Sequence, residues 1–353
     1  MKNLCTVILS ILIVQQLSLK CATSIGSVAG EAVKVKCSKI NIAEDGDIIT
    51  VLTFNIWNSG MNVENGLMKI AKHILYTNPD IVALQEVMGN SVVESLIRHL
   101  GPDWTAIAAN SSYPDVGILT RHEFLTYSDW IGDGMPEKTG HIWARIKVQK
   151  LNKQFIINFW NLHLDWHDYG PYAACNKLVT NKSQLDAGEY GQGRASLGRA
   201  QQAYFIINSD KFQQQMIECE NVTMIVAGDF NCPSHLDWID STRNQHCDWV
   251  YAWPATQLFH KAGFHDAFRV IYPDAKKNPG NTWSSAKKSQ DGWGNTIKEP
   301  QDRIDFILYK SNTHHPLSAK TYVGSHSITP EPHHYLNDWP SDHRSVLVQF
   351  KHK

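Results

Sequence analysis

Carboxylate, amide and imidazole side chains recur in this sequence where apolar segments end or begin. Six clusters of this kind occur: Asn55 in TFNIW, Glu86 in DIVALQEV, Asn161 and His163 in FWNLH, Asp229 and Asn231 in GDFN, Asp302 and Asp305 in QDRIDFIL, and Asp342 and His343 in SDHR. Any one of them alone is more typical of a turn than of a functional site. Together they supply oxygen ligands for a divalent cation and imidazoles that transfer protons near neutral pH, which indicates one shared site.

The segments beside these clusters have the patterns of alternating strands and helices. Strands are expected at 48–56, 80–87, 104–109, 115–119, 142–148, 154–163, 222–229, 304–309 and 345–350, and helices at 64–77, 91–100 and 195–217. Strands outnumber helices, and some neighbouring strands lack room for a crossover helix, which favours mixed sheets with helices outside them. No Pro-, Gly- or Ser-rich linker divides the chain, so we expect one domain with the clusters at one edge of a sheet.

In their order along the chain, the clusters resemble the endonuclease/exonuclease/phosphatase family of metal-dependent phosphoesterases. This family includes nucleases, inositol polyphosphate phosphatases and neutral sphingomyelinases. TFNIW resembles the first block of the family, QEV the second, NLHL the third, GDFN the most distinctive one, RIDFIL the penultimate one and SDH the last. The resemblance extends from about Ile48 to Phe350. It implies an α/β fold, a four-layer αββα sandwich of two mixed β-sheets flanked by helices.

The resemblance also implies a divalent cation, expected to be Mg²⁺, with Mn²⁺ or Ca²⁺ as alternatives. Glu86 is the first expected metal ligand, and Asn55 and Asp342 are its expected neighbours. The chemistry needs a cation because a phosphodiester is negatively charged and repels an attacking hydroxide.

Five further residues receive catalytic roles from the resemblance. His343 is the expected general base or its partner, with Asp305 holding its tautomer. Asp229 is expected to align or deprotonate the attacking water, and the choice between Asp229 and His343 as the base stays open. Asn231 is expected to hold a phosphate oxygen, and His163 to donate to the phosphate or to the leaving oxygen.

Candidates for substrate contact flank these blocks: Trp57, Asn161, Trp166, Tyr169 and Arg199. For Asn161 the stronger expectation is structural, as a support for His163. The interval between His163 and Arg199 is longer than a strand-to-helix connection requires, and long loops beside a site often determine specificity. Equally, Cys175 could hold this interval as a mere cap of the domain.

Residues 1–24 resemble a secretory signal peptide. Lys2 precedes an uncharged run over residues 4–14, and small residues follow at Ala22 and Ser24. We therefore expect a secreted protein with residues 25–46 as an N-terminal extension, residues 47–353 as the catalytic domain and no transmembrane segment in the mature chain. Secretion would permit disulfides, whose pairing the sequence leaves open, and glycosylation at the sequons of Asn110, Asn181 and Asn221.

Composition narrows the function classes. The 353 residues include 33 Lys and Arg against 34 Asp and Glu, and 42% are hydrophobic. The apolar content excludes intrinsic disorder, and the charge balance argues against tight non-specific coating of nucleic acid.

Three functions compete on this evidence. The favoured one is a phosphodiesterase acting on nucleic acid or nucleotides, the alternative is a phosphoesterase acting on a phospholipid headgroup or small phosphoester, and the least favoured is a non-catalytic binding protein. No protein partner can be inferred. Action at a membrane would call for an exposed apolar hairpin, for which residues 283–297 are the nearest match.

Overall fold

The computed structural model describes residues 47–132, 140–151, 153–194, 197–290 and 296–353. They belong to one compact unit, Asp47–Lys353. The expected signal peptide at 1–24 and the extension at 25–46 lie outside the described residues. Within the described residues no helix is long and apolar enough to cross a membrane.

Two six-stranded mixed sheets form the centre of the unit. The first sheet has the order β13-β14-β1-β2-β4-β3, with β13 at His314–Tyr322, β14 at Ser345–His352, β1 at Ile48–Asn55, β2 at Ile81–Val87, β4 at Asp115–Thr120 and β3 at Thr105–Ala108. The second has the order β5-β6-β7-β8-β12-β9, with β5 at Glu123–Ser128, β6 at His141–Gln149, β7 at Gln154–His163, β8 at Thr223–Asp229, β12 at Asp305–Lys310 and β9 at His265–Asp266. The β1–β2 and β7–β8 pairs are parallel, and the other pairs are antiparallel.

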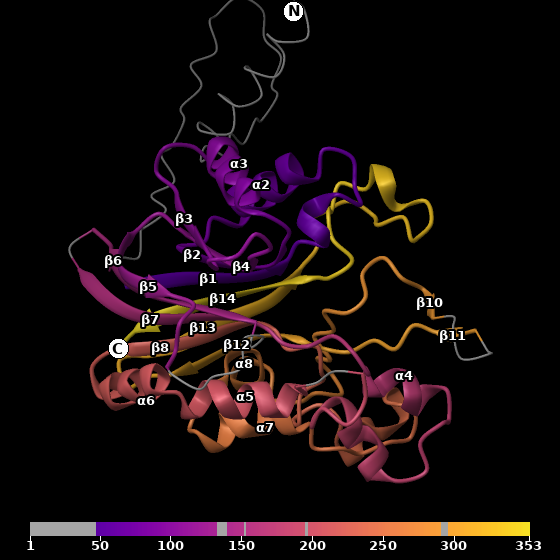
Figure 1. Cartoon of the computed structure of the whole chain (residues 1–353). Coiled ribbons are helices and arrows are strands. Elements are labelled where there is room, and N and C mark those ends of the chain that lie inside the picture. Colours follow the sequence, from indigo (N-terminus) through magenta and orange to yellow (C-terminus); the bar gives the residue numbers. More distant parts are fainter. Residues whose placement is uncertain (1–46, 133–139, 152, 195–196, 291–295) are drawn as a thin grey trace, which may run out of the picture. The chain divides into compact units, whose positions relative to one another are not determined.

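Helices cover the outer face of each sheet (Figure 1). The first sheet carries α2 (Gly66–Thr77) and α3 (Asn90–Leu100), and the second carries α4 (Gly170–Cys175), α5 (Arg199–Asn208), α6 (Asp210–Ile217) and α7 (Pro254–Lys261). The short helix α8 (Ala267–Ile271) and the two-stranded ribbon of β10 (Ser289–Gln290) and β11 (Ile297–Lys298) complete the main elements.

Burial on both faces explains why the central strands are almost continuously apolar. In β1, Ile49 and Val51 face the core between the two sheets, whereas Leu52 and Phe54 face the helices. Successive side chains of a strand alternate between its faces, so a strand covered on both sides needs apolar residues throughout. The expected four-layer αββα sandwich is thereby confirmed.

Two details of the expected secondary structure are wrong. The single helix predicted over 195–217 is two helices, because Ser209 is extended and its Oγ accepts a hydrogen bond from Phe212 N as the N-cap of α6. Strands β5 and β13 were not expected. β5 is the partly exposed first strand of its sheet, and β13 begins with His314 and His315, so neither has the buried apolar pattern that identifies the central strands.

Candidate active site

Strand register brings the polar clusters to one edge of the two sheets. The parallel pair β7–β8 places His163 directly beside Asp229, and the antiparallel pair β8–β12 places Asp305 on the other side of Asp229. In the first sheet Asn55 ends β1 beside Gln85 of β2. The carboxyl ends of β1, β2, β7 and β8 therefore meet the amino ends of β4, β12 and β14.

Gly228 allows the close approach of β8 to β7. Its φ is +143°, and a Cβ atom there would lie 1.9 Å from the carbonyl oxygen of Leu162. Only glycine avoids that clash, which explains the glycine before Asp229 in the GDFN block.

Asp229 lies at the centre of the site and is fully buried. Its Oδ1 accepts a hydrogen bond from Asn231 N at 2.8 Å, and its Oδ2 accepts one from Asn55 Nδ2 at 3.0 Å. The same Oδ2 lies 3.7 Å from Nε2 of His163 and 3.7 Å from Nε2 of His343. Burial and the charge of Asp305 raise the pKa of Asp229, and the two imidazoles oppose that rise.

His343 is held by Asp305, as the family resemblance implied. Nδ1 of His343 donates to Asp305 Oδ2 at 2.9 Å, and both side chains are buried. Burial alone would lower the pKa of His343, but the charges of Asp305 and Asp229 raise it to about 10. His343 is therefore protonated at neutral pH in the free protein, with Nε2–H facing Asp229.

His163 has a matching partner that the sequence did not reveal. Its Nδ1 donates to Asp115, at 2.9 Å from Oδ1 and 3.0 Å from Oδ2. Burial alone would lower the pKa of His163, but Asp115, Asp229 and Glu86 raise it to about 10. Asp115 escaped prediction because it is merely the first residue of the apolar strand β4, at a positive φ of 62°.

We expect Asp115→Asn to lower kcat by about tenfold to a hundredfold, because His163 loses the carboxylate that orients it and keeps it protonated. Without Asp115 the pKa of His163 falls, so the protonated form is lost at lower pH. The alkaline limb of the pH profile of kcat/KM should therefore move towards neutral pH. NMR titration of His163 measures the pKa directly, and an unchanged pKa would contradict the assignment.

Glu86 is aimed at the site by a break in its strand. The β2–β4 register shifts between Gln85 and Val87, so Glu86 is the extra residue of a bulge, with a φ of +63°. A bulge of this kind redirects a side chain, and such backbone strain persists only when the surroundings hold it. Glu86 Oε1 accepts from Asn55 Nδ2 at 3.0 Å, and Oε2 accepts from Asn58 N at 2.5 Å.

The surroundings of Glu86 fit a divalent cation. Asp342 is buried close by, its Oδ1 has no hydrogen-bond partner, and its pKa is raised to about 7 by burial, with Glu86 adding to the rise and His343 opposing it. A buried carboxylate oxygen without a hydrogen-bond partner, whose pKa a second carboxylate helps to raise, would be stabilised by a bound cation, and hard cations prefer such oxygen ligands. Glu86 and Asp342 would hold the metal.

A second group of ligands lies deeper in the same site. One ligand atom each of Asp229, Asp305 and His343 lies within 4.8 Å of the others. Asp305 Oδ2 already binds His343 Nδ1, however, so this group is better explained as a proton-transfer network. The metal site of Glu86 and Asp342 is therefore the one adopted below.

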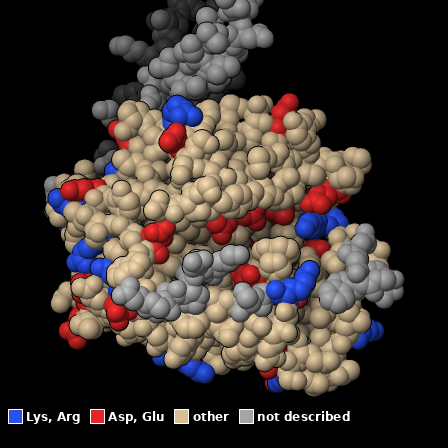
Figure 2. Space-filling model, viewed as in Figure 1, with Lys and Arg blue, Asp and Glu red and all other residues tan. Residues whose placement is uncertain are grey.

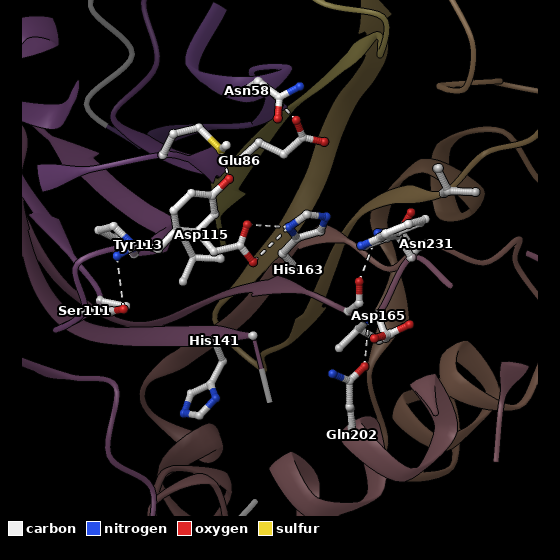
Figure 3. Close-up of a pocket in the computed structure, with 18 of the residues that line it drawn as sticks. Asn58, Glu86, Ser111, Tyr113, Asp115, His141, His163, Asp165, Gln202 and Asn231 are labelled. Carbon is white, nitrogen blue, oxygen red and sulfur yellow. Dashed lines mark hydrogen bonds and ion pairs between the residues drawn. The ribbon is translucent and has the colours of Figure 1, made fainter. Parts of the chain in front are cut away.

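A cleft of about 1430 Å³ opens over these residues. Figure 3 shows Glu86, Asp115 and His163 from different strands pointing towards one space, with Asn231 on the far side of it. Asn231 Nδ2 also donates to the carbonyl oxygen of Leu164 at 2.9 Å. The aromatic lining includes Trp57, Trp166 and Tyr169, and their contact with substrate stays a prediction.

Asn161 does not reach the cleft, so its assignment to substrate binding is wrong. It is fully buried, its Oδ1 accepts from Gln85 Nε2 at 2.7 Å, and its Nδ2 donates to the carbonyl oxygens of Leu84 and Gly117. These bonds tie the two sheets together behind His163, which is a structural role.

Arg199 is also unavailable to substrate, which corrects the second assignment. The side chain is fully buried and its Nε donates to Glu189 Oε1 at 2.6 Å. Its other guanidinium nitrogens donate to the carbonyl oxygens of Asp165, His167 and Asp168. Arg199 therefore fixes the start of the loop after His163 from behind.

We expect Arg199→Ala to lower the free energy of unfolding by about 3–5 kcal/mol, because it leaves the buried charge of Glu189 without a partner. Chemical denaturation of the variant checks this. The exposed Arg194→Ala is the control and should change stability by no more than about 1 kcal/mol. A loss equal to that of the control would contradict the structural role.

The loop between His163 and α5 is both fastened and part of the cleft wall. Cys175 in α4 forms a disulfide with Cys247, and Cys219 and Cys232 are free and buried. Tyr169 and Tyr172 line the cleft, and their hydroxyls donate to Asp302 and Glu299 at 3.0 Å and 2.6 Å. The disulfide of Cys175 therefore holds the loop, and the same loop lines the cleft. The sequence had offered attachment through Cys175 and contact with substrate as alternatives.

Comparison with known proteins agrees with this geometry. The model of the Endonuclease/Exonuclease/phosphatase family matches residues 52–343. An uncharacterized protein of Caenorhabditis elegans is 45% identical over 316 residues, which cover 90% of this chain and 95% of that protein.

Solved structures share the fold at low sequence identity. Truncated TDP2 of C. elegans gives a TM-score of 0.52 at 14% identity and covers 87% of this chain and 99% of that chain. D. rerio TDP2 complexed with a single-strand DNA product gives 0.51 at 16%, covering 86% and 99%. The catalytic domain of human Nocturnin with bound sulfate gives 0.50 at 17%, covering 87% and 95%.

Proposed function

This chain belongs to the endonuclease/exonuclease/phosphatase family, and from that membership and the geometry of the site we propose that it hydrolyses phosphodiesters by in-line attack of water. Members of the family are metal-dependent hydrolases of phosphoric esters, and the chain is such an enzyme. The observation that carries the reaction is the position of Asp229 between two imidazoles, each held by its own carboxylate, beside the pair Glu86 and Asp342.

A divalent cation held by Glu86 and Asp342 supplies the charge that offsets the repulsion between the phosphodiester and its nucleophile. Mg²⁺ is the proposed ion, on the oxygen character of the ligands. Asp229 is the proposed acceptor of the proton of the attacking water, because its carboxylate lies between the two imidazoles, which Asp115 and Asp305 hold in position.

The two protonated imidazoles are proposed to act as donors. His343 donates to a phosphate oxygen, and His163 donates to the leaving oxygen as the P–O bond breaks. Asp305 and Asp115 accept from the Nδ1–H groups and so orient each ring, which leaves each Nε2–H facing Asp229 and the reacting group. Asn231, which lines the cleft, is proposed to hold another phosphate oxygen.

The charge of the cleft bears on the substrate class. Among the described residues that line it, the carboxylates are those of Glu86, Asp115, Asp129, Asp165 and Asp342. Lys287 is the one lysine or arginine among them, and the raised pKa values of His163 and His343 add two imidazolium charges. Figure 2 shows the acidic side chains gathered along the hollow. Binding of a polynucleotide relies on lysines and arginines that track successive phosphates.

We therefore favour a single phosphodiester whose alcohol is uncharged or cationic, of the kind found in a phospholipid headgroup. The aromatic lining suits such a group, since a cation is attracted to the faces of tryptophan and tyrosine. Nucleic acid is the second candidate, supported by the DNA product bound to the D. rerio structure of the same fold.

Separate assays of different phosphoesters test the choice between a phospholipid headgroup and nucleic acid. The purified chain is assayed with bis(p-nitrophenyl) phosphate, sphingomyelin, phosphatidylcholine, inositol phosphates, single-stranded DNA and RNA, each with Mg²⁺ and with chelator. Faster turnover of the choline phosphodiesters than of DNA and RNA is expected. A preference for DNA or RNA would contradict the substrate class, and no turnover of any phosphodiester would contradict the reaction.

Secretion and glycosylation remain part of the proposal. The Cys175–Cys247 disulfide is typical of an oxidising compartment, and Asn110, Asn181 and Asn221 are all exposed. Expression in a eukaryotic secretory host should yield a chain in the medium that begins near residue 25 and loses mass on treatment with a glycosidase. Retention of residues 1–24 inside the cell would contradict the secretory assignment.

A further inference from the structure

Three large apolar side chains stand out from the surface at one rim of the cleft. Met61, Tyr335 and Leu336 are 66%, 56% and 74% exposed; we call them the rim patch. Single exposed apolar side chains are common in folded proteins, but a group of them next to a site often marks a surface that contacts a substrate or partner.

Short contacts connect the rim patch to the cleft. Glu64 N donates to the carbonyl oxygen of Tyr335 at 2.8 Å, which ties the loop of Tyr335 to the segment of Met61. The ring of His334 packs on Trp57 at 4.8 Å, and Trp57 lines the cleft. Figure 1 shows the yellow loop that ends in β14 projecting beside the indigo segment before α2.

The rim patch is held outward by a closed loop. Asn337 is buried and forms two hydrogen bonds with Thr329, from Thr329 N to its Oδ1 at 2.9 Å and from its Nδ2 to Thr329 O at 2.8 Å. Lys72 of α2 forms an ion pair with Asp338 directly behind the loop. Leu336 is therefore presented by a fixed backbone.

The charges around the rim patch select the kind of surface it can meet. Neither residues 56–68 nor residues 325–343 contain lysine or arginine, and Glu64 and Glu331 are exposed beside the patch. Anionic membranes attract clusters of lysine and arginine; Lys72 behind the loop is paired with Asp338, so these segments offer such a membrane little attraction. A lipid surface without net charge offers the rim patch apolar contact and does not repel the carboxylates beside it.

Exposed aromatic side chains also line the cleft. Tyr113, Trp130 and Trp166 line the cleft and are exposed. Tyrosine and tryptophan are favoured at the level of lipid headgroups, where one part of the ring meets apolar chains and another meets water.

Trp283 lies in the segment named above as the nearest match to a membrane-contacting hairpin, and it serves differently. Its Nε1 donates to Glu299 Oε1 at 2.7 Å, and its partly buried ring lines the cleft. Residues 291–295 of that hairpin lie outside the described residues.

We propose that the rim patch docks this enzyme on a zwitterionic lipid surface, with Leu336 and Met61 entering the headgroup region and the cleft open to a headgroup phosphodiester. This rests on the proposed function in its phospholipid form. The apolar contact supplies the attachment, and the acidic cleft accepts a headgroup that carries a cationic ammonium.

Vesicle sedimentation tests the docking without any turnover. The chain is mixed with phosphatidylcholine vesicles in chelator, and the bound fraction is compared for wild type, Leu336→Ser, Tyr335→Ser and Ile217→Ser. Ile217 is 83% exposed at the end of α6 and serves as the matched control. All variants begin at the same residue, so a difference in vesicle binding between them is due to the substituted side chain.

We expect Leu336→Ser to lower the partition coefficient roughly tenfold, Tyr335→Ser to lower it less, and Ile217→Ser to leave it unchanged. Binding should persist in 0.5 M salt. Equal partition of Leu336→Ser and Ile217→Ser, or binding that requires anionic lipid and is lost in salt, would overturn the proposal.

Hydrolysis of bis(p-nitrophenyl) phosphate separates this proposal from the proposed function. This soluble diester needs no docking, so all three variants should cleave it at the wild-type rate. If neither wild type nor any variant cleaves this diester, the proposed function fails, whatever the result of vesicle sedimentation. If wild type cleaves it and Leu336→Ser sediments with vesicles as wild type does, the docking proposal alone fails.

Discussion

Replacing His343 by alanine should lower kcat for a soluble phosphodiester by about 10²- to 10⁴-fold, the range typical of a positioned proton-transfer group. His343 is buried, its Nε2 lies 3.7 Å from Asp229, and its pKa of about 10 keeps it protonated at neutral pH because Asp305 and Asp229 outweigh the effect of burial. Alanine removes the imidazole that Asp305 holds and that is proposed to donate to the phosphate. KM should change less than kcat, because the donor acts most strongly as charge develops in the transition state.

The exposed His99→Ala on α3 is the control for this variant and should retain the wild-type rate. Asp305→Asn should show an intermediate loss, with the alkaline limb of its kcat/KM profile moved towards neutral pH. The direction follows from the charge: without Asp305 the pKa of His343 falls, and the protonated donor is lost at lower pH. Full activity of His343→Ala would remove the basis of the proposed chemistry.

Replacing Glu86 by glutamine should weaken Mg²⁺ binding by on the order of a hundredfold or more, since even the loss of an outer partner of a metal ligand costs 10- to 100-fold. The amide keeps the shape of the side chain but removes the negative charge that a hard cation prefers. Isothermal titration calorimetry measures the affinity without turnover. Mg²⁺ should raise the melting temperature of wild type and have little effect on the variant.

Glu94→Gln is the matched control for Glu86→Gln, because Glu94 is an exposed carboxylate on α3. It should bind Mg²⁺ as wild type does. Without metal, Glu86→Gln loses one of the two hydrogen bonds that the carboxylate accepts from Asn55 Nδ2 and Asn58 N, but it relieves the repulsion that adds to the raised pKa of Asp342. Equal Mg²⁺ affinity of wild type and Glu86→Gln would exclude Glu86 as a ligand.

The sequence was sufficient to predict the residues that end or begin central strands. Glu86, His163, Asp229 and His343 are readable because each interrupts or borders an apolar segment whose partners bury it on both faces. Their convergence follows from the geometry of strands that share one edge. The pairing of Asp305 with His343 came from the family resemblance, and the structure contains it.

Residues whose role depends on a distant partner could not be predicted in the same way. Asp115 acts through His163, which lies 48 positions away, and only the β2–β4 register beside the bulge at Glu86 brings it to the site. Its one signal was an acidic residue at the start of a buried strand. Arg199 shows the converse: nothing in its neighbours indicates that Glu189 and three carbonyl groups enclose its guanidinium.

The metal dependence of phosphodiester cleavage tests the central claim most directly. The wild-type chain is stripped with chelator, and the hydrolysis of bis(p-nitrophenyl) phosphate is followed while Mg²⁺ is added back. We predict no turnover above background in chelator, and a rate that rises and saturates as Mg²⁺ fills the site of Glu86 and Asp342. Turnover that continues unchanged in chelator would contradict the account.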